Sequence, residues 1–336
     1  MRRVALAVFL LSFAAQAADG GAATSSSAVA LPNGAPGIGF DDLRMAHGLG
    51  KVLVPAGRSG RLDLVDPKAL EVVAISGFSE KKSFEGGHDD GVTSADEGRG
   101  LLFATDRTTK KLSIIDPRAG KIVGELALSG GPDYVRYVST TDEVWVTEPD
   151  VEAIEIFKLS AGDKPSVQRV ANVHIKGGPE SLVIDAASGR AFTHLWSGKS
   201  VAIDLKKRSV GPAWANGCKG SRGIAFDAAA GWLITGCAEG GAGVIDVRTG
   251  ELVSSLSAGS GVDIIDYDPK RRRIYLGAGG SATLEILQLS SDGKLSHVAS
   301  IPTQKGSHCV AANGDGLLFV CDPSHGQLLV IHDPQS

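Results

Sequence analysis

The stretch SRGIAFDAAAGWLITGCAEGGAGVIDVRTGEL, residues 221–252, decides the fold. It contains three short apolar runs at residues 223–226, 232–235 and 243–246, and a fourth run begins after the turn Arg248-Thr249-Gly250. Runs this short, bounded by Gly, Ala and Asp, are typical of strands and not of helices. The stretch therefore predicts a four-stranded antiparallel meander of roughly 42 residues, the length of one propeller blade.

The same unit occurs seven times between residues 37 and 336. The second strands align as KVLVP (51–55), LLFAT (101–105), EVWVT (143–147), RAFTH (190–194), WLITG (232–236), RIYLG (273–277) and LLFVC (317–321). Five third strands end in aspartate, which suits a turn cap better than catalysis; these are Asp66, Asp116, Asp204, Asp246 and Asp333. The repeat predicts an all-β, seven-bladed β-propeller.

The N-terminus has the features of a secretory signal peptide. Arg2 and Arg3 precede an apolar run at residues 4–15, and Ala15-Gln16-Ala17 matches a small-x-small cleavage site. The run is shorter than the roughly 20 residues that span a bilayer, and no later stretch is long and apolar enough. We expect residues 1–17 to be removed before Ala18, which gives a soluble, periplasmic protein without a membrane span.

The last unit ends at Ser336 after its third strand, so its blade lacks a fourth. A propeller closes when its first and last blades are joined. We expect the leader, residues 18–36, to supply residues 28–31 as the outer strand of that blade, and residues 37–336 to form the propeller. The alternative is a three-stranded last blade.

The composition limits the classes of function. The chain has 336 residues and a formal net charge of −4, so it carries no basic field for generic nucleic-acid binding. No G-x-S-x-G, P-loop, H-E-x-x-H or C-x-x-C-H motif occurs. We therefore expect a monomer whose partner is a small polar ligand or a periplasmic protein.

Four cysteines lie in the C-terminal third: Cys218, Cys237, Cys309 and Cys321. An even number in an exported chain indicates disulfides, and four cysteines allow three pairings. Local pairing, Cys218 with Cys237 and Cys309 with Cys321, brackets one hairpin in each case. Free buried thiols are the alternative.

The hairpins IIDPRAGKIVGEL (114–126) and GVIDVRTGELVSSL (243–256) resemble those of YVTN-type seven-bladed propellers, bacterial periplasmic proteins that include the YncE-like proteins. The YVTN tetrapeptide itself is absent, and the matching strands read FATD, WVTE and YLGA. The resemblance implies a propeller that binds a ligand or partner. More distantly, the units resemble the propellers of lactonases and of cofactor-containing oxidoreductases.

One ionisable residue recurs just before the first strand of every unit: Asp41, Asp90, Asp133, Glu180, Arg222, Asp263 and His308. First strands line the channel of a propeller, so we expect these side chains to crowd the channel mouth. Crowded carboxylates raise one another's pKa, and they can bind Ca²⁺ or a polar ligand carrying hydroxyls or positive charge. The alternative is that they pair with each other and face water.

Loops on the same rim add His88 and His325, which with His308 could form a transition-metal site. The other loop candidates are Asp106, Arg107, Glu148, Asp150, Trp196 and Glu239. The metal candidates together are Asp90, Asp133, Glu180, Asp263, His88, His308 and His325. The leading hypothesis is a non-enzymatic binding or scaffold protein. The alternatives are a Ca²⁺-dependent, lactonase-like hydrolase and an accessory propeller of a periplasmic redox system.

Overall fold

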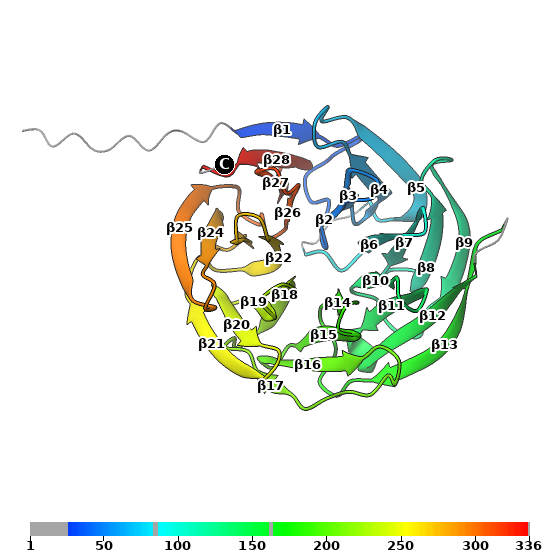
Figure 1. Cartoon of the computed structure of the whole chain (residues 1–336). Coiled ribbons are helices and arrows are strands. Elements are labelled where there is room, and N and C mark those ends of the chain that lie inside the picture. The colour runs from blue at the N-terminus through cyan, green and yellow to red at the C-terminus, as the bar shows by residue number, and fades with distance from the viewer. Residues whose placement is uncertain (1–25, 83–86, 161–163, 335–336) are drawn as a thin grey trace, which may run out of the picture.

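The computed structural model describes residues 26–82, 87–160 and 164–334. These residues form seven four-stranded antiparallel sheets arranged as blades around a central channel (Figure 1). Their one helical element is the single 3-10 turn Pro149–Val151. The prediction of an all-β, seven-bladed propeller is confirmed. The predicted signal peptide, residues 1–17, lies outside the described residues, as do residues 18–25 of the leader.

Each blade runs from an inner to an outer strand. Blades one and two contain β2 (Arg44–Ala46), β3 (Lys51–Pro55), β4 (Ser59–Val65), β5 (Val72–Glu80), β6 (Val92–Gly98), β7 (Leu101–Asp106), β8 (Lys111–Asp116) and β9 (Lys121–Ala127). Blades three and four contain β10 (Val135–Val138), β11 (Glu143–Glu148), β12 (Ala153–Ser160), β13 (Ser166–His174), β14 (Val183–Asp185), β15 (Arg190–Leu195), β16 (Lys199–Asp204) and β17 (Trp214–Ala215). Blades five and six contain β18 (Ser221–Asp227), β19 (Trp232–Cys237), β20 (Ala242–Asp246), β21 (Glu251–Leu256), β22 (Val262–Asp268), β23 (Arg273–Ala278), β24 (Thr283–Leu289) and β25 (Leu295–Pro302). Blade seven contains β26 (Val310–Ala312), β27 (Leu317–Asp322), β28 (Gln327–His332) and β1 (Ser26–Ala30).

Burial follows the position of a strand in its blade. Every residue of the second strands β11, β19 and β23 is buried, because both faces of the sheet pack on neighbouring blades at that point. The outer strand β9 alternates exposed and half-buried residues, since it lies at the rim. All seven second strands begin at the residue that the sequence predicts.

The N-terminal strand closes the ring, as predicted. β1 pairs antiparallel with β28, with Ala28 opposite Leu329, and completes the sheet order β1-β28-β27-β26. Val29 and Leu31 are buried in the core. Apolar burial and main-chain pairing therefore join the two ends of the described chain and protect the edge of the last blade.

Most of the repeated aspartates cap turns, as expected. The carboxylate of Asp66 accepts hydrogen bonds from the backbone N–H groups of Lys68 and Ala69, both at 2.8 Å. Asp116, Asp204 and Asp246 accept equivalent bonds in their own hairpins. Asp333 differs, because it accepts a hydrogen bond from the Tyr275 hydroxyl at 2.8 Å.

The two cysteine pairs behave differently. Cys218 and Cys237 form the predicted disulfide, but Cys309 and Cys321 are free thiols, so the second predicted bond is wrong in this structure. The two residues are close in space, since the backbone N–H of Cys309 donates to Cys321 Sγ at 3.0 Å and the two sulfur atoms lie within 4.8 Å of each other. Both free thiols are fully buried, whereas in the disulfide Cys218 is half-buried and Cys237 is buried.

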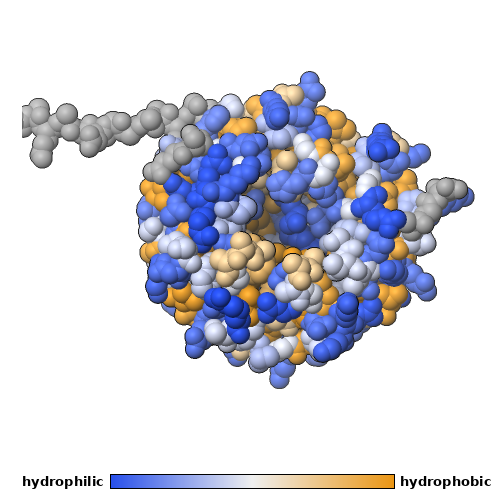
Figure 2. Space-filling model, in the orientation of Figure 1, coloured by the Kyte–Doolittle hydropathy of each residue, from blue (hydrophilic) through white to orange (hydrophobic). Residues whose placement is uncertain are grey.

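The channel is visible from outside as a hollow at the centre of the ring, bordered by hydrophilic residues above and by more hydrophobic ones below (Figure 2). Within the described ranges, no helix has the length and apolar content to cross a membrane.

Candidate functional site

Six of the seven predicted rim residues converge at one mouth of the channel, where two loop residues join them. We call this set the mouth cluster: Asp41, His88, Arg107, Asp133, Glu180, Arg222, Asp263 and His308. The inner strands bring these residues together because each rim residue lies at or just before the start of the first strand of its blade; Arg222 and Asp263 are the second residues of β18 and β22.

Asp90 does not belong to the mouth cluster, which corrects one prediction. It forms an ion pair with Lys81 at 2.9 Å. The turn between β6 and β7 is short, because Gly98 pairs with Leu101 and only residues 99–100 lie between them. In blade one, Ala46 pairs with Lys51, and residues 47–50 form the corresponding turn. The register of blade two is shifted as a result, and Thr93 takes the rim position. Thr93 is fully buried and its hydroxyl lies 3.1 Å from that of Thr105.

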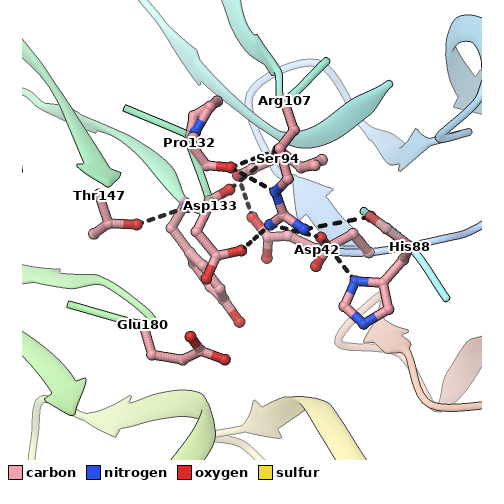
Figure 3. A network of polar contacts seen from close by, with 12 residues as sticks. Asp42, His88, Ser94, Arg107, Pro132, Asp133, Thr147 and Glu180 are labelled. Carbon is pink, nitrogen blue, oxygen red and sulfur yellow. Dashed lines mark hydrogen bonds and ion pairs between the residues drawn. The ribbon is translucent and has the colours of Figure 1, made fainter. Parts of the chain in front are cut away.

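Arg107 holds one side of the mouth together (Figure 3). Its guanidinium donates to Asp133 Oδ1 at 2.5 Å and to the carbonyl oxygen of Pro132 at 2.9 Å, and it reaches Asp41 Oδ2 at 3.3 Å. Burial raises the pKa of Asp133, and the charge of Arg107 acts in the opposite direction. Sequence analysis named Arg107 only as a loop candidate, because nothing local marks it as the cation between two rim carboxylates.

Two histidines face Asp263. His88 Nε2 lies 3.3 Å from Asp263 Oδ2, and His308 Nε2 lies 3.9 Å from the same oxygen. The two rings stack with centroids 4.9 Å apart. Burial lowers the pKa of His88, but the charges of Asp41 and Asp263 outweigh burial and raise the pKa to about 10. The structure therefore brings together two of the three histidines that the sequence singled out, His88 and His308.

Glu180, Arg222 and Trp196 form the opposite side of the mouth. Arg222 pairs with Glu180 at 3.0 Å, and the indole N–H of Trp196 donates to the other carboxylate oxygen. The Arg222 guanidinium lies 5.8 Å from the centre of the Trp196 ring, and Trp196 is 49% exposed. Burial raises the pKa of Glu180 to about 9, with a further rise from Asp133 and an opposing effect of Arg222.

Two cavities open beside the mouth cluster. One, of about 460 Å³, is bounded by Arg107, Asp133, Glu180 and Trp196. The other, of about 610 Å³, is bounded by His88, Asp263 and His308. Arg222, His88 and Asp263 line both cavities, so a small molecule can meet charged side chains from several blades at once.

A second charged layer lies deeper in the channel, and sequence analysis missed it. Arg136 holds Asp42 with two bonds of 2.6 Å and 3.0 Å, and the Ser94 hydroxyl donates to Asp42 at 2.5 Å (Figure 3). Both charged residues are buried, and the guanidinium stacks 4.6 Å from the centre of the Tyr134 ring. We call Asp42 and Arg136 the inner pair. The only sequence signal for it is the consecutive pair Asp41-Asp42.

The predicted metal ligands are brought together only in part. His325 lies apart, because its Nδ1 pairs with Asp322 Oδ2 at 2.8 Å. The carboxylates proposed for Ca²⁺ do not form one oxygen cage, since Asp90 pairs with Lys81, Asp133 with Arg107 and Glu180 with Arg222. His88, Asp263 and His308 do converge.

No protein-family profile and no curated protein sequence matches the chain. The fold is similar to a chain in the crystal structure of a mitotic checkpoint complex, with 14% sequence identity and a TM-score of 0.74 over 99% of this chain and 98% of that one. It is also similar to a chain of Kuenenia stuttgartiensis hydrazine synthase, with 13% identity and a TM-score of 0.72 over 88% and 96% of the two chains. At sequence identities this low, the structural similarity supports the β-propeller fold and carries no information about the site.

Proposed function

We propose that this chain is an exported, monomeric binding protein of the YVTN-type, YncE-like kind, which holds a small polar ligand at the mouth of its channel in the periplasm. The features of a signal peptide at residues 1–17 and the YVTN-like hairpins support export and kinship. A propeller provides a rigid ring on which residues from different blades meet, which suits a binding or scaffold role.

The observation that carries the proposal is the exposed ring of Trp196 beside the cavity of about 460 Å³. Glu180 fixes the indole through its N–H, so the ring is held in place while half of its surface stays open to solvent. An immobilised aromatic face next to carboxylate and guanidinium groups suits a ligand with one apolar face and several hydroxyl groups. We therefore propose a polyhydroxylated small molecule as the ligand.

The lactonase-like alternative has less support. A Ca²⁺ ion needs several free, charged oxygen ligands, whereas Asp133 and Glu180 already contact guanidinium groups and burial raises the pKa of both. An accessory role in a redox system is supported by no specific contact among the described residues.

Binding is tested with the purified mature protein and a panel of glucose, myo-inositol, putrescine and gluconolactone, followed by calorimetry and thermal shift. We expect a polyol to bind, and Trp196→Ala and Glu180→Gln to weaken it about tenfold or more, equivalent to about 1.4 kcal/mol. Asp90→Asn is the matched control, because it removes a rim charge outside the mouth cluster. Equal binding by Trp196→Ala, or binding of putrescine alone, would refute the polyol proposal.

A further inference from the structure

We propose that His88, Asp263 and His308 bind one divalent transition-metal ion at the channel mouth. The three residues come from different parts of the ring: His88 from the segment before β6, Asp263 from the start of β22 and His308 from the segment before β26. The argument for this site does not use Trp196 or Glu180, on which the polyol proposal rests, although His88 and Asp263 also line the cavity beside Trp196.

The distances already approach those of a metal site. His88 Nε2 and Asp263 Oδ2 are 3.3 Å apart, and His308 Nε2 is 3.9 Å from the same oxygen. One ligand atom from each of the three residues lies within 4.8 Å of the others. Bonds of about 2.0–2.2 Å to a tetrahedral ion place its ligand atoms about 3.4 Å apart. The distance between His88 Nε2 and Asp263 Oδ2 already fits such an ion. The distance between His308 Nε2 and Asp263 Oδ2 reaches this value after a small rotation of the His308 side chain.

The outer contacts of both histidines supply a second, independent observation. His88 Nδ1 lies 3.2 Å from Asp41 Oδ2, and His308 Nδ1 lies 2.6 Å from the carbonyl oxygen of Gly306. Metal-binding histidines almost always donate their second ring N–H to a carboxylate or a backbone carbonyl. These contacts orient both rings so that both Nε2 atoms face Asp263.

One further contact bears on the site. The carbonyl oxygen of Phe40 lies 2.9 Å from His308 Nε2, so it accepts a hydrogen bond from this nitrogen when no ion is bound. An incoming metal ion therefore competes with this hydrogen bond and displaces a proton from His308, and it also displaces the proton by which His88 Nε2 contacts Asp263.

The donor set and the access route define the kind of ion. Two imidazoles and one carboxylate suit Zn²⁺, Fe²⁺ or Co²⁺, whereas Ca²⁺ takes oxygen ligands only. All three residues line the cavity of about 610 Å³, so water or a small ligand can complete the coordination. Three protein ligands with an open position are the arrangement found in catalytic, not structural, metal sites.

A neighbouring set of donors competes for softer ions. One ligand atom from each of His308, Cys309 and Cys321 also lies within 4.8 Å of the others. This set shares His308 with the proposed site, but both thiols are fully buried. An ion that enters the cavity therefore meets His88, Asp263 and His308 before it can reach the buried thiols. Substitution of His88 or of the two cysteines distinguishes the two donor sets.

The probe is Co²⁺, titrated into the metal-free mature protein and followed by its visible absorption and by calorimetry. We expect one ion per chain. His88→Ala and Asp263→Ala should weaken binding about 100-fold or more, and Asp41→Ala, which removes an outer contact of His88, should weaken it about tenfold. His325→Ala is the matched control and should bind normally, since His325 pairs with Asp322. Circular dichroism and thermal melting of each variant show that it is folded.

Two results would overturn the proposal. The first is the absence of stoichiometric Co²⁺ binding, or binding that His88→Ala leaves unchanged. The second is a thiolate-to-cobalt charge-transfer band that disappears in the double variant Cys309→Ser/Cys321→Ser, which would move the site to the thiols. Normal Co²⁺ affinity in that double variant supports the assignment to His88, Asp263 and His308.

Discussion

The channel contains two layers of charged side chains that are built from the same residue types in different ways. The inner pair, Asp42 and Arg136, is bidentate, 2% and 4% exposed, and further bonded by Ser94. The mouth cluster spreads its charges over many blades, and two cavities open beside it. The inner pair is almost fully buried beside a cavity of about 190 Å³. The mouth cluster combines buried carboxylates, such as Asp41 and Asp133, with the partly exposed His88 and Arg222, which line the two larger cavities.

This difference separates a structural role from a binding role. The inner pair connects the start of blade one to β10 of blade three, so breaking it leaves a buried charge without compensation. At the mouth, a lost partner can be replaced by water or by another charge, because several groups lie within reach. The same chemistry is therefore expected to stabilise the fold in one layer and to remain available to ligands in the other.

The largest expected effect comes from the variant Asp42→Ala. It leaves the buried guanidinium of Arg136 without its carboxylate partner and should lower the free energy of unfolding by about 3–5 kcal/mol. Denaturant unfolding at neutral pH measures this loss. The mouth variant Asp133→Ala is the comparison, and we expect it to cost about 1–2 kcal/mol, since Arg107 keeps Asp41 as a partner.

The double variant Asp42→Leu/Arg136→Met sharpens the same test. Replacing both charges by apolar side chains removes the burial penalty of each, so it should recover most of the stability that Asp42→Ala loses. A double variant as unstable as Asp42→Ala would show that the contacts with Ser94 and Tyr134, and not the charge pair, stabilise this layer.

A smaller effect is expected from pH. The folded-state pKa of Glu180 is about 9, above its ordinary value of 4.5. Between these values the native state keeps a proton that the unfolded chain has released, so the free energy of unfolding falls as pH rises from about 4.5 to 9. Glu180→Gln should make this decline shallower, by on the order of 1–2 kcal/mol over the window. Unfolding measured at several pH values with EDTA present tests this, and an unchanged slope would contradict it.

The sequence predicts the blades well because their signals are local. Short apolar runs and turn residues place all seven second strands, and the missing outer strand of the last blade points to β1. The residues at the rim are harder to predict from local sequence, because the residue that occupies each rim position depends on the length of the hairpin that follows it. Arg99 and Gly100 adopt φ values of 55° and 75° in the two-residue turn of blade two. That turn puts Thr93, and not Asp90, at the rim.

The contacts of the site depend on which partner lies nearest in space, which the sequence does not show. His325 pairs with Asp322, three residues away, and so stays out of the channel. Arg107 pairs with Asp41 and Asp133, which come from neighbouring blades. The sequence predicts that Cys309 and Cys321 lie close together, but it does not reveal that both remain free, fully buried thiols.

The smallest expected effect is on the stability of the Trp196→Ala variant. The ring is half exposed, and its N–H bonds Glu180, which keeps Arg222 as a partner. The free energy of unfolding should therefore change by less than about 0.5 kcal/mol, the range of ordinary surface substitutions. Denaturant unfolding of this variant, beside Asp90→Asn, gives the value. A loss above about 2 kcal/mol would place Trp196 with the inner pair as a stabilising residue and would remove the main support for a ligand platform at the mouth.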